Sequence, residues 1–233
     1  MRILLLADIH ANWPALQAIR EEYDVCLFVG DLVDYGVDPA PCVDWVRQHA
    51  THSVRGNHDH GVAQDVEVEG KNGYKYLTGE TRPLSRERLN PEQIRFLSRL
   101  PLTKMVTLNK LRFLLVHATP RDPLDEYAPN DLQFWERRLE KVDADVICVG
   151  HTHHQYVLEV GEKLVINPGS VGQPRDGDPR AAYAILEDTK VDLKRVSYPI
   201  DETARAVNES SLTAQVKRHL IEIYQKGGVT RSS

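Results

Sequence analysis

Residues 54–60 read VRGNHDH. A short apolar segment ends here, and a glycine and four polar side chains follow it. In order they are Gly56, Asn57, His58, Asp59 and His60. Imidazole and carboxylate groups bind metals and move protons, and three of the four polar side chains are of this kind. A strand needs none of them in order to end, so the stretch predicts a functional site.

The chain before this stretch alternates between strand and helix patterns. Its strands read as continuous apolar runs, which are typical of strands buried on both faces. The first helix is expected to begin after Asn12, as an N-cap, with Pro14 in its first turn. The expected elements are a strand at 2–8, a helix at 11–23, a strand at 24–30, a helix at 39–49 and a strand at 51–57. This alternation predicts a largely parallel central sheet.

The second half of the chain reads mainly as antiparallel β-structure. Asn109-Lys110 predicts the turn of a hairpin, and Gly227-Gly228 is expected to end a C-terminal helix. The expected strands are 104–108, 111–117, 144–150, 155–160, 163–168, 181–186 and 190–196, with helices at about 130–141 and at 211–225.

Length and composition predict one globular domain spanning residues 1–233. The chain has 41% hydrophobic and 27% charged residues, which is ordinary for a soluble protein. Residues 60–104 are more polar and are punctuated by GKNG and TGETRP, with a short helix pattern at 90–100. We expect residues 60–104 to form a lid-like insertion over the site, and residues 200–233 to form a C-terminal helical extension.

Charge and hydropathy exclude several functions. A formal net charge of −5 predicts no stable binding to nucleic acid or to an anionic membrane. No apolar run approaches the roughly 20 residues that span a bilayer, and the N-terminus has no signal-peptide cleavage site. Cys26, Cys42 and Cys148 are too scattered for a disulfide framework or a thiolate zinc site. We therefore expect a cytoplasmic protein; the sequence does not indicate its oligomeric state.

Each polar motif of the chain follows an apolar run. Because the carboxyl ends of parallel strands line one edge of an α/β sheet, these motifs are expected to meet there. The residues expected to meet are Asp8, His10, Asp31, Asn57, His117, His151 and His153.

Seven oxygen and nitrogen donors in one place would be unfavourable without a countercharge. Two cations that share one carboxylate would satisfy all of them. The mixture of imidazole and carboxylate without thiolate favours Mn, Fe, Co, Ni or Zn over Mg or Ca. A single motif of this kind is more often ordinary turn chemistry, so the prediction depends on all five occurring together in this order.

These motifs resemble those of a known family. DIH (8–10), GDLVDYG (30–36), GNHD (56–59), VHA (116–118) and GHTH (150–153) resemble the five ordered motifs of the calcineurin-like metallophosphoesterase superfamily, above all its compact bacterial and archaeal phosphodiesterase/phosphatase branch. The resemblance covers residues 1–186. It implies a four-layer α/β/β/α sandwich, with two mixed β-sheets flanked by helices.

The resemblance also implies two divalent transition-metal ions, with manganese as the first choice. One ion would be held by Asp8, His10, Asp31 and His153. The other would be held by Asp31, Asn57, His117 and His151, so that Asp31 bridges the two. The implied reaction is attack on phosphorus by a hydroxide that bridges the metals.

His58 is not a ligand in this scheme. An imidazole beside such a centre is placed to give a proton to the departing oxygen or to stabilise its charge. Asp34 resembles the family's carboxylate partner for this histidine, and Asp59 is the rival partner because it is adjacent in sequence.

The substrate is expected to be a small phosphoester, which could be a nucleotide. Phosphoprotein phosphatases of the superfamily carry an arginine that clamps the phosphate, and Tyr35 stands in its place here. This favours phosphodiesters, or a substitute arginine. Arg121 is the first candidate for a substitute and joins Asn57 as an expected substrate-binding residue. Arg175 or Arg180 could also reach a phosphate, but we expect both to be solvated.

Other functions remain open from the sequence. Cyclic-nucleotide diesterase, dinucleoside polyphosphate hydrolase and phosphomonoesterase or phosphoprotein phosphatase activities are all compatible with the motifs. A non-enzymatic scaffold is disfavoured because His58 and the full set of ligands are present.

Overall fold

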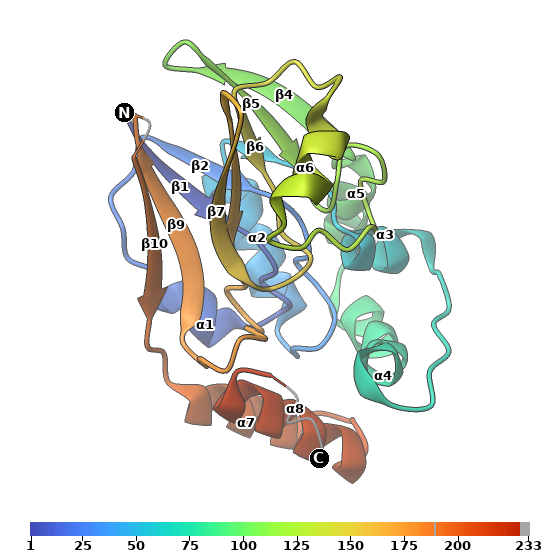
Figure 1. Ribbon diagram of the computed structural model, residues 1–233. Helices are drawn as coiled ribbons and strands as arrows, with labels where there is room; N and C mark the ends of the chain where they lie inside the picture. The colour runs from blue at the N-terminus through green and yellow to red at the C-terminus, as the bar shows by residue number, and fades with distance from the viewer. Residues whose placement is uncertain (189, 229–233) are drawn as a thin grey trace.

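The protein is a sandwich of two five-stranded sheets with helices on both outer faces, as the computed structural model of residues 1–188 and 190–228 shows (Figure 1). The strand order is β10-β9-β1-β2-β3 in the first sheet and β4-β5-β6-β8-β7 in the second. Both sheets contain parallel and antiparallel pairs. The expected four-layer fold with two mixed sheets is confirmed.

The first sheet has a parallel half and an antiparallel half. β1 (Arg2–Leu6), β2 (Val25–Phe28) and β3 (His52–Ser53) are parallel, and β9 (Ala181–Glu187) and β10 (Lys190–Val196) add an antiparallel hairpin beside β1. The central sheet is therefore less parallel than the β-α-β rhythm predicts, because that rhythm covers only the first half of the chain. β3 is also shorter than predicted.

Two helices connect the parallel strands. α1 (Trp13–Ala18) begins where predicted, since the Asn12 side chain accepts a hydrogen bond from the Ala15 amide. It ends five residues earlier than expected, because Ile19 is already extended. α2 (Pro39–His49) has the predicted bounds.

The second sheet is built around three parallel strands with an antiparallel strand at each edge. β5 (Leu111–Val116), β6 (Val146–Cys148) and β8 (Lys163–Pro168) are parallel. β4 (Thr103–Leu108) and β7 (Gln155–Val160) form the edges. Asn109 and Lys110 make the predicted hairpin turn, with φ of 47° and 70°. α6 (Leu132–Leu139) covers the outer face.

Apolar side chains fill three parallel layers. Leu5, Leu27, Phe113 and Ile166 are among those that fill the space between the sheets, which is why these strands read as continuous apolar runs. A second layer separates the first sheet from α1 and α2, and a third lies beneath α6 around Trp135. The three cysteines are buried and free.

The predicted insertion is mostly helical. It contains α4 (Gly73–Arg88), α5 (Pro91–Arg99) and the end of α3 (Asn57–Gln64). Asn57 thus begins a helix rather than ending a strand. TGETRP, expected as a break, lies inside α4 with Pro83 in the helix. The α5 side chain Leu97 packs into the layer below the first sheet.

The C-terminal helices pack against α4. α7 (Ile200–Glu209) and α8 (Ala214–Lys226) lie together at one end of the sandwich (Figure 1). Leu77 of α4 shares an apolar cluster with Val207, Leu220 and Tyr224. Residues 229–233 of the expected extension, and Thr189 of the expected β9–β10 turn, lie outside the described residues. No described helix is long and apolar enough to cross a membrane.

Candidate metal centre

The predicted metal-binding residues lie together at the carboxyl ends of the strands. Asp8 and His10 follow β1, Asp31 follows β2, His117 follows β5, and His151 and His153 follow β6, while Asn57 begins α3. All are buried except Asn57 and His151, which are partly exposed. Asp8, His10, Asp31, His151 and His153 have positive φ values of 53°, 47°, 65°, 65° and 61°. Residues other than glycine rarely adopt positive φ values, and the residues that do are concentrated at functional sites.

Backbone carbonyls set the tautomer of three of these histidines. The Nδ1 atoms of His10, His117 and His153 lie 2.9, 2.8 and 2.5 Å from the carbonyl oxygens of Val33, Val29 and Gln173. A carbonyl only accepts hydrogen bonds, so each Nδ1 carries the proton and donates. Each Nε2 is therefore the nitrogen that faces the centre, as in metal-binding histidines.

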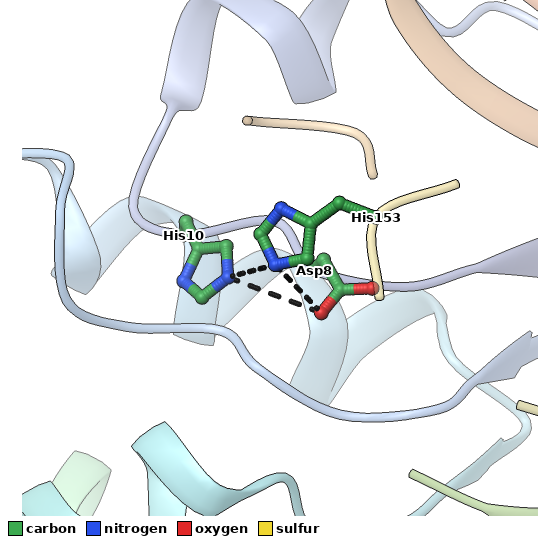
Figure 2. Close-up of side chains that lie close together, drawn as sticks. All are labelled: Asp8, His10 and His153. Atoms are coloured by element: carbon green, nitrogen blue, oxygen red, sulfur yellow. Dashed lines mark hydrogen bonds and ion pairs between the residues drawn. The ribbon is translucent and has the colours of Figure 1, made fainter. Parts of the chain in front are cut away.

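One cluster consists of Asp8, His10 and His153 (Figure 2). The two imidazole Nε2 atoms are 3.1 Å apart, and Asp8 Oδ1 lies 3.3 Å from His153 Nε2 and 3.9 Å from His10 Nε2. Burial lowers the pKa of both histidines well below its ordinary value, so both rings are neutral. Two lone pairs at this distance repel each other, and a cation among the three side chains removes the repulsion.

A second cluster consists of Asp31, His117 and His151. His117 Nε2 lies 3.1 Å from Asp31 Oδ2 and 3.1 Å from the Asn57 amide oxygen. Burial lowers the pKa of His117, but the Asp31 carboxylate outweighs this effect and raises it to about 9. Without metal, a proton on Nε2 bridges these groups. A cation that binds here must displace that proton.

Asp31 lies between the two clusters. Its Oδ2 atom is 3.1 Å from His117 Nε2 in one cluster and 3.8 Å from His10 Nε2 in the other. Its Oδ1 atom accepts a hydrogen bond from the His58 amide at 2.9 Å. A Cβ atom at Gly56 would lie 2.0 Å from this Oδ1, so the close approach requires glycine. The donor set therefore fits two cations that share one carboxylate.

Asp34 and Asp59 have different roles in the structure. His58 Nδ1 lies 2.8 Å from Asp34 Oδ2. Asp59 instead accepts hydrogen bonds from the amides of Asp31, Leu32 and Gly56 at 2.8, 2.7 and 3.0 Å. It braces the strand end that carries Asp31, and its geometry does not make it the partner of His58.

Arg82 is a residue of the site that the sequence motifs do not predict. This residue is 7% exposed, and its Nε and Nη2 atoms donate to Asp34 Oδ2 at 3.1 and 2.7 Å. No motif marks it, because it lies in the middle of α4, in a segment that reads as a punctuated insertion. Its contact with Asp34 places it at the site.

A pocket of about 740 Å³ opens beside the centre. It is lined by residues of both clusters and by His58, Tyr35, Tyr74, Lys75, Arg82 and Arg175. Residues between 60 and 82 contribute much of its wall, whereas α5 packs in the core. Only the first part of the expected lid segment therefore adjoins the site.

Arg175, and not Arg121, lines the pocket beside Arg82. Arg121 is absent from the pocket lining; its side chain is 72% exposed, and it lies 3.7 Å from Glu126. The guanidinium of Arg175 lies over the Tyr74 ring, 3.8 Å from its centroid, and Nη2 donates to Gln173 Oε1 at 3.0 Å. Its Nε is buried and has no hydrogen-bond partner in the structure. Arg175 is therefore partly buried and held by these contacts, and not a solvated side chain as we preferred to expect.

Comparison with known proteins gives a consistent result. A sequence model described as the calcineurin-like phosphoesterase superfamily domain matches residues 1–190. An uncharacterized protein of Methanocaldococcus jannaschii is 32% identical and covers 90% of this chain and 93% of its own length. The phosphodiesterase YfcE of Escherichia coli K12 is 24% identical, and the match covers 93% of this chain and 97% of YfcE.

Two solved structures share the fold over nearly the whole chain. A metallophosphoesterase from Sphaerobacter thermophilus is 33% identical with a TM-score of 0.81, covering 97% of this chain and 99% of its own. A hypothetical protein from Pyrococcus horikoshii is 21% identical with a TM-score of 0.85, and the match covers 98% of this chain and 99% of that protein. The second likeness concerns the fold alone.

Proposed function

The chain belongs to the calcineurin-like phosphoesterase superfamily and is a metal-binding phosphoester hydrolase, and from this premise we propose that it uses two divalent transition-metal ions to hydrolyse phosphodiesters. The observation that carries the proposal is the position of Asp31. Its Oδ2 atom lies within 4 Å of an imidazole Nε2 in each cluster. One carboxylate is thereby available to two cations.

The ligand sets follow from the two clusters. Asp8, His10 and His153 would hold one ion and Asn57, His117 and His151 the other, with Asp31 shared. Imidazole and carboxylate ligands suit Mn, Fe, Ni, Co or Zn, and we propose Mn as the first choice because of the family resemblance. When bound, such a pair of ions supplies an activated water for attack on phosphorus and neutralises the phosphoryl oxygens.

His58 is the acid for the leaving group in this proposal. Its Nδ1 atom is held by Asp34, so Nε2 is the free end of the ring, and it lies 4.0 Å from Asp31 Oδ2 on the side of the metal centre. A proton at Nε2 is therefore within reach of an oxygen that departs from phosphorus there. Asp34 fixes the direction of the ring.

The pocket supports a preference for diesters. Tyr35 stands where related phosphatases carry a phosphate-clamping arginine, and the buried Tyr35 side chain cannot provide that cation. Glu67, Glu69 and Asp125 also line the pocket and would repel a second negative charge on the substrate. Arg175 also lines the pocket and offers its guanidinium to one phosphoryl oxygen.

Arg175 also supports one alternative. A guanidinium carries enough donors to bind a monoester dianion, so phosphomonoesterase or phosphoprotein phosphatase activity is the second candidate. Dinucleoside polyphosphates would also fit this chemistry. Tyr74, which lines the pocket with its ring against Arg175, would contact their nucleoside part.

Metal reconstitution tests the proposal. Metal-free protein is supplied with Mn, Ni, Co, Zn or Mg, and both bound metal per chain and turnover of an aryl phosphodiester and an aryl phosphomonoester are measured. We expect two bound ions per chain, and faster turnover of the diester with a transition metal than with Mg. A single bound ion at full activity would contradict the dinuclear centre, and faster monoester turnover would favour the alternative.

A further inference from the structure

Helix α4 presents a polar face to the turn that carries Asp34. Thr78, Thr81, Arg82 and Ser85 are all buried on this face. The Asp34 amide donates to Ser85 Oγ at 3.2 Å, and the Tyr35 amide donates to Thr81 Oγ1 at 2.9 Å. The Thr78 hydroxyl lies 3.1 Å from the Tyr35 hydroxyl. These buried polar side chains lie on one face of the helix and contact a single turn. That turn carries Asp34, the partner of His58.

Arg82 is the charged member of this face. Its Nε and Nη2 atoms both donate to Asp34 Oδ2, and its Nη1 atom donates to the Val66 carbonyl at 3.0 Å. All three donor atoms of the guanidinium therefore have partners, which fixes the plane of the group. The Asp34 carboxylate is fully buried, and Arg82 supplies its countercharge.

The contacts of Asp34 converge on one oxygen. Oδ2 lies against both Arg82 nitrogens and His58 Nδ1, whereas Oδ1 is buried and has no hydrogen-bond partner in the structure. A purely structural ion pair would be free to use both oxygens in a bidentate arrangement, which is the favourable geometry for arginine and carboxylate. Arg82 instead holds the oxygen that faces His58.

Attachment of α4 to the fold does not depend on Arg82 alone. Leu77 and Leu84 of the same helix pack with Val207, Leu220 and Tyr224 in an apolar cluster. Replacing Arg82 with a neutral side chain should therefore leave the helix in place.

We propose that Arg82 is a positioning residue for the hydrolytic reaction. It fixes the Asp34 carboxylate, which in turn holds the His58 ring with Nε2 directed toward the metal centre. The inference rests on the proposed role of His58 as the acid. It also makes α4 a fixed part of the site, because a helix that swung away as a lid would remove Arg82 from Asp34.

Kinetics of Arg82→Gln and Arg82→Lys test the proposal, with Arg86→Gln as the matched control. Arg86 lies one helical turn further along α4 and pairs with Asp65 without contacting the site. We expect Arg82→Gln to lower kcat roughly 10- to 100-fold with little change in KM or bound metal, as loss of an orienting contact does. Arg82→Lys keeps the positive charge but cannot donate two hydrogen bonds from one planar group. The decrease in kcat should therefore be intermediate.

A double-mutant comparison separates positioning from a general structural effect. If Arg82 acts through His58, Arg82→Gln should lower kcat less than about twofold when His58 is already replaced by alanine. Its effect in the wild-type background should also be larger for poor leaving groups than for aryl oxides. The same fold loss in both backgrounds, or for all leaving groups, would overturn the proposal.

A second readout is independent of activity. In metal-free protein, the proton between His58 Nδ1 and Asp34 should give a downfield proton NMR signal, assigned by its disappearance in His58→Ala. Arg82→Gln should shift or broaden this signal and Arg86→Gln should leave it unchanged; a signal unmoved by both would overturn the inference. An inactive wild-type protein whose signal still responds to Arg82 would contradict the proposed function and not the contact.

Discussion

The Nδ1 atom of His58 lies 2.8 Å from the Oδ2 atom of Asp34, although 24 positions separate the two residues in sequence. Both side chains are buried, with 7% and 0% of their surface exposed. This contact leaves Nε2 as the free nitrogen of the ring and directs it toward Asp31. The geometry is that of an orienting carboxylate behind an imidazole, and its consequences are measurable.

His58→Ala should leave metal content nearly intact and lower turnover of a poor leaving group by roughly 10²- to 10⁴-fold, the range for a general acid. The loss should shrink for an aryl oxide, which departs with little protonation. Asp34→Asn should reproduce part of the effect. The measurement is the ratio of variant to wild-type turnover across leaving groups of rising pKa. A flat ratio would remove His58 from the acid role.

Asp31→Asn should lower the occupancy of both metal ions together. The carboxylate lies between the two clusters, so its charge is lost to both. Metal analysis after gel filtration gives the number of ions per chain. Asp44→Asn is the control, since Asp44 lies on α2 and pairs only with Arg47 among the described residues. Loss of a single ion, with the other retained at full occupancy, would contradict a shared ligand.

Arg175→Gln should lower kcat/KM by roughly 10- to 100-fold, because one charge-assisted contact to a phosphoryl oxygen is worth about 1.5 to 3 kcal/mol. Arg121→Gln and Arg180→Gln should stay within about twofold of wild type. Arg121 lies outside the pocket, and Arg180 pairs with Asp178 at the surface. Steady-state kinetics with one diester decides among the three. A larger effect at Arg121 than at Arg175 would show that the loop after β5 closes over the substrate.

Glu126→Gln should change how stability depends on pH. Hydrogen bonds from Arg138 lower the pKa of Glu126 from its ordinary value of 4.5 to about 2. A carboxylate with a lowered pKa stabilises the folded state above its unfolded pKa, and this contribution is lost as pH falls through the folded pKa. The difference in unfolding free energy between wild type and variant should therefore be constant above about pH 5.5 and shrink toward pH 2.

Chemical denaturation at several pH values checks this expectation. Glu136→Gln is the matched control, because Glu136 lies on α6, is exposed and forms no ion pair among the described residues. Its difference from wild type should not vary across the same pH range. If the difference in unfolding free energy between wild type and Glu126→Gln grew as the pH fell, the pair with Arg138 would not form in solution.

Much of the fold follows from local sequence patterns. The apolar runs of β1, β2, β5 and β6 and the turn at Asn109-Lys110 depend on neighbouring residues, so the pattern alone predicts them. The ends of these runs also mark the polar side chains of the centre, because each strand delivers its next residues to the same edge. Where local patterns were misleading, as for TGETRP in α4, burial against α8 outweighs the weak helix propensity of glycine and proline.

The sequence by itself determined the chemical character of this protein: the strand ends, the imidazole and carboxylate donors and the expected pairing of His58 with Asp34 are all written in short motifs. Only the tertiary structure decided what surrounds them. Arg82 reaches Asp34 across 48 positions, Asp59 braces the Asp31 amide across 28, and Arg175 rather than Arg121 enters the pocket. The physical reason is that such contacts depend on how whole helices and loops pack together. The residues next to Arg82 and Arg175 in the sequence therefore do not predict which distant residues these arginines contact.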